Sequence, residues 1–181
     1  REPPFFFQKN PDNLDFSGTF TKPEKSLDVH YEIELVIAIS KGGKDISLAS
    51  AVNHVYGYAL GLDMTRRDLQ GEMKKMGRPW EIGKAFEKSA PMAPIIPASD
   101  LGHPVQGLID LKVNGVLKQK GDLNQMIWKT AEMISYLSTY YELAAGDLIM
   151  SGTPAGVGPI VKGDIMTGSI AGMGELLVTV V

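Results

Sequence analysis

Three carboxylates, from two places in the chain, could together bind a metal ion. Glu32 and Glu34 are two residues apart in a segment that alternates polar and apolar residues, and Asp63 lies at the end of a second apolar segment. Side chains two apart on a β-strand project from the same face. Like charges in a partly buried place need a cation, or one of them must take up a proton. Carboxylate oxygens suit Mg2+ or Mn2+, and they would also accept Ca2+ as a non-native occupant.

A simpler interpretation of each carboxylate stays open. Glu32 and Glu34 could be ordinary surface acids on a half-exposed strand. Asp63 could cap a helix that we expect to follow it, and Thr65 could do the same. The chain has no cysteine, which excludes disulfides, thiolate metal sites and a cysteine nucleophile. A metal site at this place would therefore have oxygen ligands.

Cationic and amide side chains follow the carboxylates. Arg67 and Gln70 are three residues apart, so on a helix they face one side and could grip one planar anion. Lys84 has apolar neighbours, and it could be a surface lysine whose charged end reaches solvent. If it is buried near a metal, it could instead stabilise a developing negative charge. We interpret the lysine pair at 74–75 as a solvated helix face.

A glycine-rich segment covers residues 151–158, with the sequence Ser-Gly-Thr-Pro-Ala-Gly-Val-Gly. The backbone amides, such as that of Gly152, and the Thr153 hydroxyl could bind a carboxylate, although the segment could also be a structural turn cluster. It has neither the lysine of a phosphate-binding loop nor the dinucleotide fingerprint. The chain also has no Gly-x-Ser-x-Gly elbow. A nucleotide-binding protein and a serine hydrolase are both disfavoured.

The elements that would position these residues are mostly strands. The expected strands and hairpin lie at residues 29–39, 56–64 and 108–119, with short strands from 148 onward. The hairpin is expected to turn at Asn114-Gly115. The expected helices lie at residues 47–54 (with Ser47 as N-cap), 66–76 and 122–141. With its 20 glycines and 11 prolines, this pattern predicts a β-rich α+β roll with a few helices.

Composition bounds the classes of protein that the chain can belong to. Its 181 residues, 44% hydrophobic and 22% charged, predict one catalytic domain over residues 1–181. The net charge of −3 gives no sign of a nucleic-acid or membrane partner, and no apolar run is long enough to cross a bilayer. The lack of cysteine is compatible with the cytoplasm, where we expect the protein. The opening Arg-Glu-Pro-Pro leads us to expect a preceding N-terminal segment.

The ordered combination of these motifs resembles the fumarylacetoacetate hydrolase superfamily over nearly the whole chain. The motifs are His30-x-Glu32-x-Glu34, Gly57-Tyr58 leading to Asp63-x-x-x-Arg67-Asp68, Lys84-x-Phe86 and the glycine-rich segment 151–158. Within the superfamily, residues 1–7 and 122–128 are most similar to the fumarylpyruvate hydrolases.

The resemblance implies a mixed β-sandwich roll that usually forms a homodimer. It implies Mg2+ or Mn2+ bound by Glu32, Glu34 and Asp63. It also implies a small anionic α-keto acid substrate, with its keto-acid end surrounded by Arg67, Gln70, Lys84 and Thr153, and a further lysine near the site at Lys9. The expected reaction is the hydrolytic cleavage of a carbon–carbon bond in an acylpyruvate such as 3-fumarylpyruvate, in aromatic (gentisate) catabolism.

The expected catalytic residues are Lys84 and His30. Lys84 would add positive charge as a pyruvate enolate departs. Family members of this type activate water with a His/Glu pair on an N-terminal lid, which residues 1–181 do not include, and His30 is the nearest substitute. In the alternative, His30 hydrogen-bonds a metal ligand.

Alternative functions remain open at this point. An oxaloacetate decarboxylase or a hydroxymuconate-type isomerase or decarboxylase would use the same metal and enolate chemistry. A non-catalytic binding protein on the same fold is the alternative from a different class.

Overall fold

The computed structural model describes residues 1–181, and β-strands dominate it. The strands are β1 Leu14–Asp15, β2 Thr19–Phe20, β3 Val29–Tyr31, β4 Ile33–Ile39, β5 Val55–Leu62, β6 Thr65–Arg66, β7 Ala90–Pro91, β8 Ile96–Pro97, β9 Leu108–Val113, β10 Val116–Asp122, β11 Leu148–Met150, β12 Gly158–Pro159, β13 Ile165–Ile170 and β14 Gly174–Val180. The α-helices are α1 Arg67–Met76, α2 Glu81–Lys84, α3 Ala98–Leu101 and α4 Thr130–Tyr140. Three short 3-10 helices are η1 Pro11–Asn13, η2 Ala51–His54 and η3 Leu123–Gln125.

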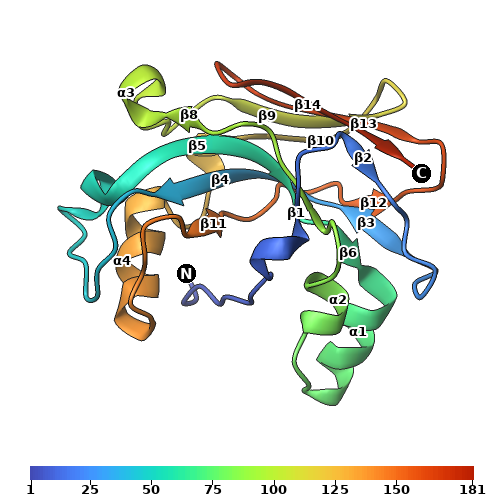
Figure 1. Ribbon diagram of the computed structural model, residues 1–181, viewed down its shortest axis with the longest axis horizontal. Helices are drawn as coiled ribbons and strands as arrows, with labels where there is room; N and C mark the ends of the chain where they lie inside the picture. Colours follow the sequence, from blue (N-terminus) through green and yellow to red (C-terminus); the bar gives the residue numbers. More distant parts are fainter.

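Two sheets face each other across the main core (Figure 1). One has five strands in the order β10-β9-β13-β14-β2, and the other has four in the order β11-β4-β5-β8. Every second residue of the facing strands points inward, as in Leu35 and Ile37 from β4 and Leu111 from β9. These side chains belong to one cluster of 31 buried hydrophobic residues. The expected β-rich α+β fold is confirmed.

Three chain segments each contribute one strand to the four-stranded sheet and the adjoining strand to a separate three-stranded sheet. β4 and β5 pair with each other in the first sheet, whereas β3 and β6, which adjoin them in the chain, pair in the second. β11 likewise pairs with β4, and β12 pairs with β3. The crossing falls at Glu32 in one segment and at residues 63–64 in another, where the Asp63 amide N–H donates to the Glu32 carbonyl at 2.8 Å. The single strand predicted at 29–39 is therefore two strands.

Other predicted elements are confirmed where a local pattern was decisive. The predicted strand at 56–64 is β5, and the predicted helix at 66–76 is α1. The hairpin of β9 and β10 turns at Asn114-Gly115, with φ of 52° and 77°, because a two-residue turn of this kind needs both central residues in the left-handed region. Neither Asp63 nor Thr65 caps α1, since its N-cap is Arg66 and no side chain caps it.

Two predicted helices are wrong in extent. Residues 122–141 form η3 and then α4 rather than one helix. The Asp122 carboxylate accepts the Asn124 amide at the start of η3, and Glu132 accepts the Lys129 amide at the start of α4, so the chain begins a helix twice. In the segment at 47–54, only η2 is helical, and Ser47 is not its N-cap.

The helices lie at opposite ends of the sheets. α1 and α2 pack against each other at one end, and α4 lies at the other (Figure 1). None of the helices is both long enough and apolar enough to cross a membrane.

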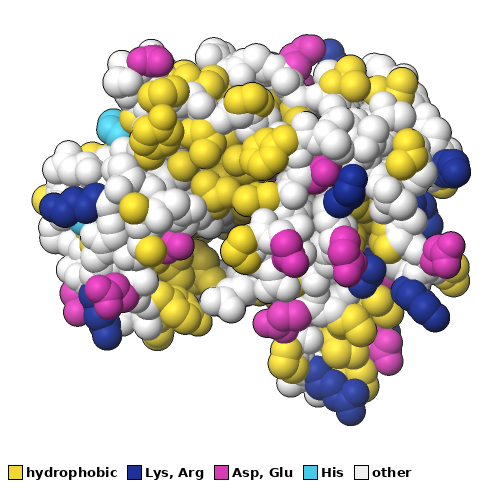
Figure 2. Space-filling model, viewed as in Figure 1, with side chains coloured by type: hydrophobic (Ala, Val, Ile, Leu, Met, Phe, Trp, Pro, Cys, Tyr) yellow, Lys and Arg dark blue, Asp and Glu magenta, His cyan; other side chains and the backbone are white.

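The outer face of the four-stranded sheet is also apolar. Val36, Ala59 and Met92 form a second, small buried cluster there, and partly buried hydrophobic side chains pack around it. Figure 2 shows hydrophobic side chains gathered over this region, where β5 and β8 lie. A contiguous apolar patch of this kind commonly marks an interaction surface.

Candidate active site

Glu32, Glu34 and Asp63 come together at the crossing between the sheets. Their exposed fractions are 7%, 4% and 1%, so all three carboxylates are buried. One oxygen of each lies within 4.8 Å of one oxygen of the other two. Surface acids and a helix cap are thus both excluded as their roles. Three buried carboxylates at this spacing have the donor set that Mg2+ and Mn2+ prefer.

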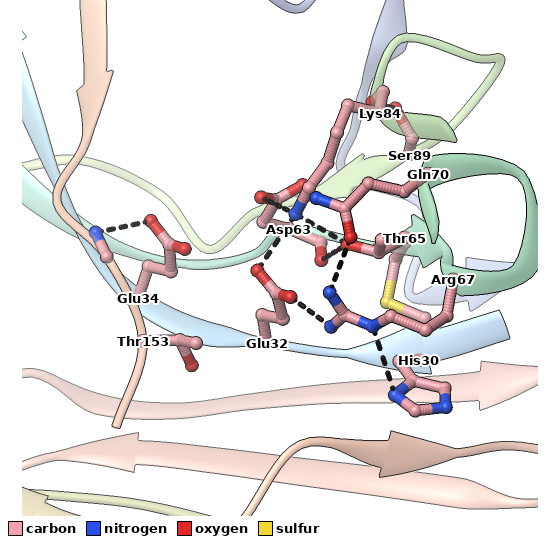
Figure 3. Close-up of polar contacts among 12 residues, drawn as sticks. His30, Glu32, Glu34, Asp63, Thr65, Arg67, Gln70, Lys84, Ser89 and Thr153 are labelled. Atoms are coloured by element: carbon pink, nitrogen blue, oxygen red, sulfur yellow. Dashed lines mark hydrogen bonds and ion pairs between the residues drawn. The ribbon is translucent and has the colours of Figure 1, made fainter. Parts of the chain in front are cut away.

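Lys84, at the end of α2, joins two of these carboxylates (Figure 3). Its side chain is 2% exposed, and its ammonium donates to Glu32 Oε2 at 2.9 Å and to Asp63 Oδ2 at 2.6 Å. The Thr65 hydroxyl accepts a third hydrogen bond at 2.6 Å. The interpretation of Lys84 as a surface lysine is therefore wrong. Its three donors are all used, which holds the charge at one place beside the cluster.

Arg67 approaches Glu32 from the first turn of α1 (Figure 3). Its guanidinium pairs with Glu32 Oε1, and its Nη1 donates to Gln70 Oε1 at 2.7 Å. The expected shared face of Arg67 and Gln70 is confirmed. The Gln70 amide nitrogen has no partner in the protein, and the Arg67 side chain keeps 27% of its surface exposed. Both side chains could therefore still contact a small anion at the edge of the cluster.

His30 lies behind Arg67 and does not contact a carboxylate of the cluster. Arg67 Nε donates to His30 Nδ1 at 3.3 Å, and His30 Nε2 lies 2.9 Å from Asp28 Oδ1. Because arginine only donates, Nδ1 must accept, and the ring proton is on Nε2 and faces Asp28. The expected hydrogen bond from His30 to a metal ligand is therefore absent. The nitrogen that could act as a base is already used by Arg67.

Lys9 and Phe7 bring the N-terminal segment to the other side of the cluster. Lys9 Nζ lies 2.9 Å from Asp63 Oδ1, and it hydrogen-bonds the carbonyls of Met64, Lys84 and Ser89. Burial lowers the pKa of Lys9, and the charge of Asp63 partly offsets this. The Phe7 ring lies over the Lys84 ammonium, 4.9 Å from centroid to nitrogen. A hollow of about 240 Å³ beside Phe7 is lined by residues 5–7 and 78–81.

Glu34 is held differently from the other two carboxylates. The Gly152 amide donates to its Oε2 at 2.8 Å, and no lysine or arginine contacts it (Figure 3). Burial, together with the nearby charges of Asp63 and Glu32, raises its pKa well above the usual range of a glutamate. Asp63, by contrast, has a cation at each oxygen, because Lys9 Nζ lies 2.9 Å from Oδ1 and Lys84 Nζ 2.6 Å from Oδ2. Glu34 is therefore the under-compensated member of a cluster whose oxygens lie within 4.8 Å of one another, so a divalent metal ion fits the cluster.

Thr153 lies beside the site, with its hydroxyl already bonded. It donates to the Ile33 carbonyl at 2.8 Å, and it accepts from Gln119 Nε2 at 2.8 Å. Gly152 and Thr153 therefore hold the segment that carries Glu32 and Glu34. Gln119 was not predicted from the sequence because it sits in an otherwise exposed, lysine-rich strand of a different sheet. No local pattern in the sequence marks it, because Gln119 stands between Lys118 and Lys120 and its burial follows a register shift of the β9–β10 pair.

Comparison with known proteins agrees with this arrangement. The family model for the fumarylacetoacetate (FAA) hydrolase C-terminal domain matches residues 1–181. The chain belongs to the fumarylacetoacetate hydrolase family. The resemblance inferred from the motifs is thereby confirmed. The similarity includes fumarylpyruvate hydrolases.

Relatives in this family differ in the reaction that their names state. The chain is 46% identical to a fumarylpyruvate hydrolase of Ralstonia sp. over 180 residues, covering 99% of this chain and 93% of that protein. It is 40% identical over 172 residues to a mitochondrial oxaloacetate decarboxylase of Dictyostelium discoideum, covering 94% and 79%. A crystal structure of fumarylpyruvate hydrolase from Pseudomonas aeruginosa in complex with Mn2+ and pyruvate superposes with a TM-score of 0.97. That chain is 54% identical, and the match covers 100% of this chain and 80% of that one.

Proposed function

We propose that the protein is a metal-dependent hydrolase that cleaves 3-fumarylpyruvate into fumarate and pyruvate. The observation that carries the proposal is the buried cluster of Glu32, Glu34 and Asp63, with Arg67 and Lys84 beside it. The similarity to fumarylpyruvate hydrolases, one of them crystallised with Mn2+ and pyruvate, supports this substrate and metal. The three carboxylates would hold Mg2+ or Mn2+, which when bound polarises the 2-oxo group of the substrate.

The positive charges of Arg67 and Lys84 offset the negative charge of the metal site and the substrate. Three carboxylates around a divalent ion leave the centre negative, whereas the substrate is itself an anion. Arg67 and Gln70 would bind the keto-acid end, because they lie at the partly exposed edge of the cluster with unused donor groups. Thr153 and Gly152 would border the substrate from the Glu34 side, where they already hold the segment that carries the metal ligands.

The bond changes of the reaction define the role of Lys84. The water oxygen adds to the acyl carbonyl carbon, and the bond from this carbon to C3 of the pyruvate part breaks. The bonding electrons pass to the pyruvate enolate, which a proton then converts to pyruvate. Lys84 would stabilise the negative charge on this enolate because its ammonium is fixed and buried. His30 is a weaker candidate for the base that activates water, since its Nδ1 accepts from Arg67.

The reaction can be followed by the loss of the conjugated enol absorbance of 3-fumarylpyruvate. We expect turnover with Mn2+ or Mg2+, none with EDTA, and fumarate and pyruvate as products. Oxaloacetate is the matched second substrate, because a 40% identical relative is an oxaloacetate decarboxylase. Turnover of oxaloacetate but not of 3-fumarylpyruvate, with metal bound, would favour the decarboxylase. Metal binding without turnover of either would favour another substrate or a binding protein.

We also propose that the enzyme is a cytoplasmic homodimer of aromatic catabolism. The apolar outer face of the four-stranded sheet supports self-association (Figure 2). The substrate assignment supports the pathway, and the lack of cysteine is compatible with a reducing compartment. Sedimentation analysis and cell fractionation would test the assembly and the compartment. A monomer at micromolar concentration would contradict the homodimer. Recovery of the protein from outside the cytoplasm would contradict the proposed location.

A further inference from the structure

Gln119 is a buried polar side chain that connects the two halves of the molecule. It lies on β10 of the five-stranded sheet, where the neighbours Lys118 and Lys120 are exposed, and Gln119 itself is 0% exposed. The register of the β9–β10 pair shifts between Leu117 and Gln119. An irregularity of this kind re-aims a side chain, and here the side chain enters the space between the sheets.

The hydrogen bonds of Gln119 all go to the segments that carry the metal site. Its Oε1 accepts the Ile33 amide N–H at 3.0 Å, and its Nε2 donates to Thr153 Oγ1 and to the Pro154 carbonyl, both at 2.8 Å. Ile33 stands between Glu32 and Glu34, next to the point where the chain changes sheets. A buried amide N–H without an acceptor is destabilising, and Gln119 supplies the acceptor for the Ile33 amide.

The same contacts fix the loop that holds Glu34. The Thr153 hydroxyl, which accepts from Gln119, donates to the Ile33 carbonyl. The neighbouring Gly152 amide donates to the Glu34 carboxylate. The loop also packs directly on β10. A Cβ on Gly156 would lie 2.2 Å from the Lys118 carbonyl oxygen, and φ of this residue is +102°, so only glycine permits this approach.

We infer that Gln119 is a positioning residue for the metal centre. It binds the peptide between Glu32 and Glu34 on one side and the loop of Gly152 and Thr153 on the other. It thereby sets the separation of Glu34 from Glu32 and Asp63, without touching the metal or the substrate. The inference rests on the proposed metal binding. It goes further by assigning a determinant of metal affinity to a residue outside the carboxylate cluster.

The test is a titration of the folded, metal-free chain with Mn2+, in which the EPR signal of the free ion reports binding. We expect Gln119→Met to weaken Mn2+ binding about 10- to 100-fold, as loss of a group that orients a metal ligand does. Gln119→Asn should also weaken Mn2+ binding, because the shorter amide cannot reach both segments at once. The loss should be smaller than in Gln119→Met, because methionine has no amide to bond either segment. Gln119→Asn also provides a result if Gln119→Met does not fold.

The matched control is Ser138→Ala. Ser138 lies on α4, far from the carboxylate cluster, and is likewise 0% exposed. Its hydroxyl accepts from the Ile46 amide and donates to the Ser135 carbonyl. Its loss should lower the melting temperature but leave Mn2+ affinity within about twofold, as expected for a distant independent site. Wild-type affinity in a folded Gln119 variant, or an equal loss in Ser138→Ala, would overturn the inference. Failure of the wild-type chain to bind Mn2+ would instead overturn the proposed function, and this inference with it.

Discussion

The two sides of the carboxylate cluster are built on opposite principles. Glu32 and Asp63 share the Lys84 ammonium, and each has a further cation in Arg67 or Lys9. Glu34 is equally buried, but it has only the Gly152 amide. The first side is therefore electrostatically complete without metal, whereas the second is not. Glu34 is therefore the ligand whose charge most requires the metal ion, because burial without a contacting cation disfavours its ionised form.

Substitution of Lys84 should have the largest effect on activity and stability. In Lys84→Met, Glu32 and Asp63 lose their shared cation, so both sides of the cluster become deficient. We expect turnover of 3-fumarylpyruvate to fall on the order of a hundredfold or more. In EDTA the free energy of unfolding should fall by about 3–5 kcal/mol, as for a buried ion pair that loses one partner.

Steady-state kinetics and chemical denaturation check this prediction. Lys75→Ala is the matched control, because Lys75 is exposed on α1 and makes no ion pair. It should change neither quantity measurably. Near-normal turnover in Lys84→Met would show that its charge is not used in the reaction.

A pair of isosteric substitutions separates the two sides directly. In the metal-free protein, Glu32→Gln should lower the free energy of unfolding by about 1–3 kcal/mol, because Arg67 and Lys84 lose a charged acceptor. Glu34→Gln should instead leave it unchanged or raise it by about 1 kcal/mol, since an uncompensated charge is removed. Both variants should bind Mn2+ more weakly than the wild type. If both substitutions lowered the free energy of unfolding, or both raised it, the charges of Glu32 and Glu34 would not be compensated differently.

The pH dependence of stability gives the smallest and most specific effect. The pKa of folded Glu34 is raised, so between the usual glutamate range near 4.5 and this raised value the folded chain binds more protons than the unfolded one. The contribution of Glu34 to the free energy of unfolding therefore falls as pH rises through this window, and it is constant above it.

Denaturation of the EDTA-treated protein from pH 4.5 upward, compared with Glu34→Gln, measures this contribution. As pH rises, the free energy of unfolding of the wild type should fall relative to that of Glu34→Gln. Saturating Mn2+ should abolish the trend, because binding of the ion compensates the charge. A difference that does not vary with pH would contradict the raised pKa.

Local patterns in the sequence determined much of the fold and the chemical type of the site. Asn114-Gly115 specified a hairpin because these residues tolerate positive φ, and alternation placed Glu32 and Glu34 on one face. The carboxylates, Arg67, Gln70 and Lys84 were found from residue type, spacing and resemblance to the family. The long helix predicted at 122–141 failed because the side chains of Asp122 and Glu132 start two separate helices.

Contacts between distant segments of the chain determine which carboxylates have a cation beside them. The break at Glu32 arises because three segments change sheets together, which no single segment specifies. Gln119 meets Ile33 across 86 residues of chain, and Gly152 meets Glu34 across 118. Whether a buried carboxylate has a cation depends on such distant contacts, since its electrostatic energy is set by the groups around it in space. The sequence therefore specified which groups the site contains, and the packing of the sheets specified which carboxylate was left without a counter-charge.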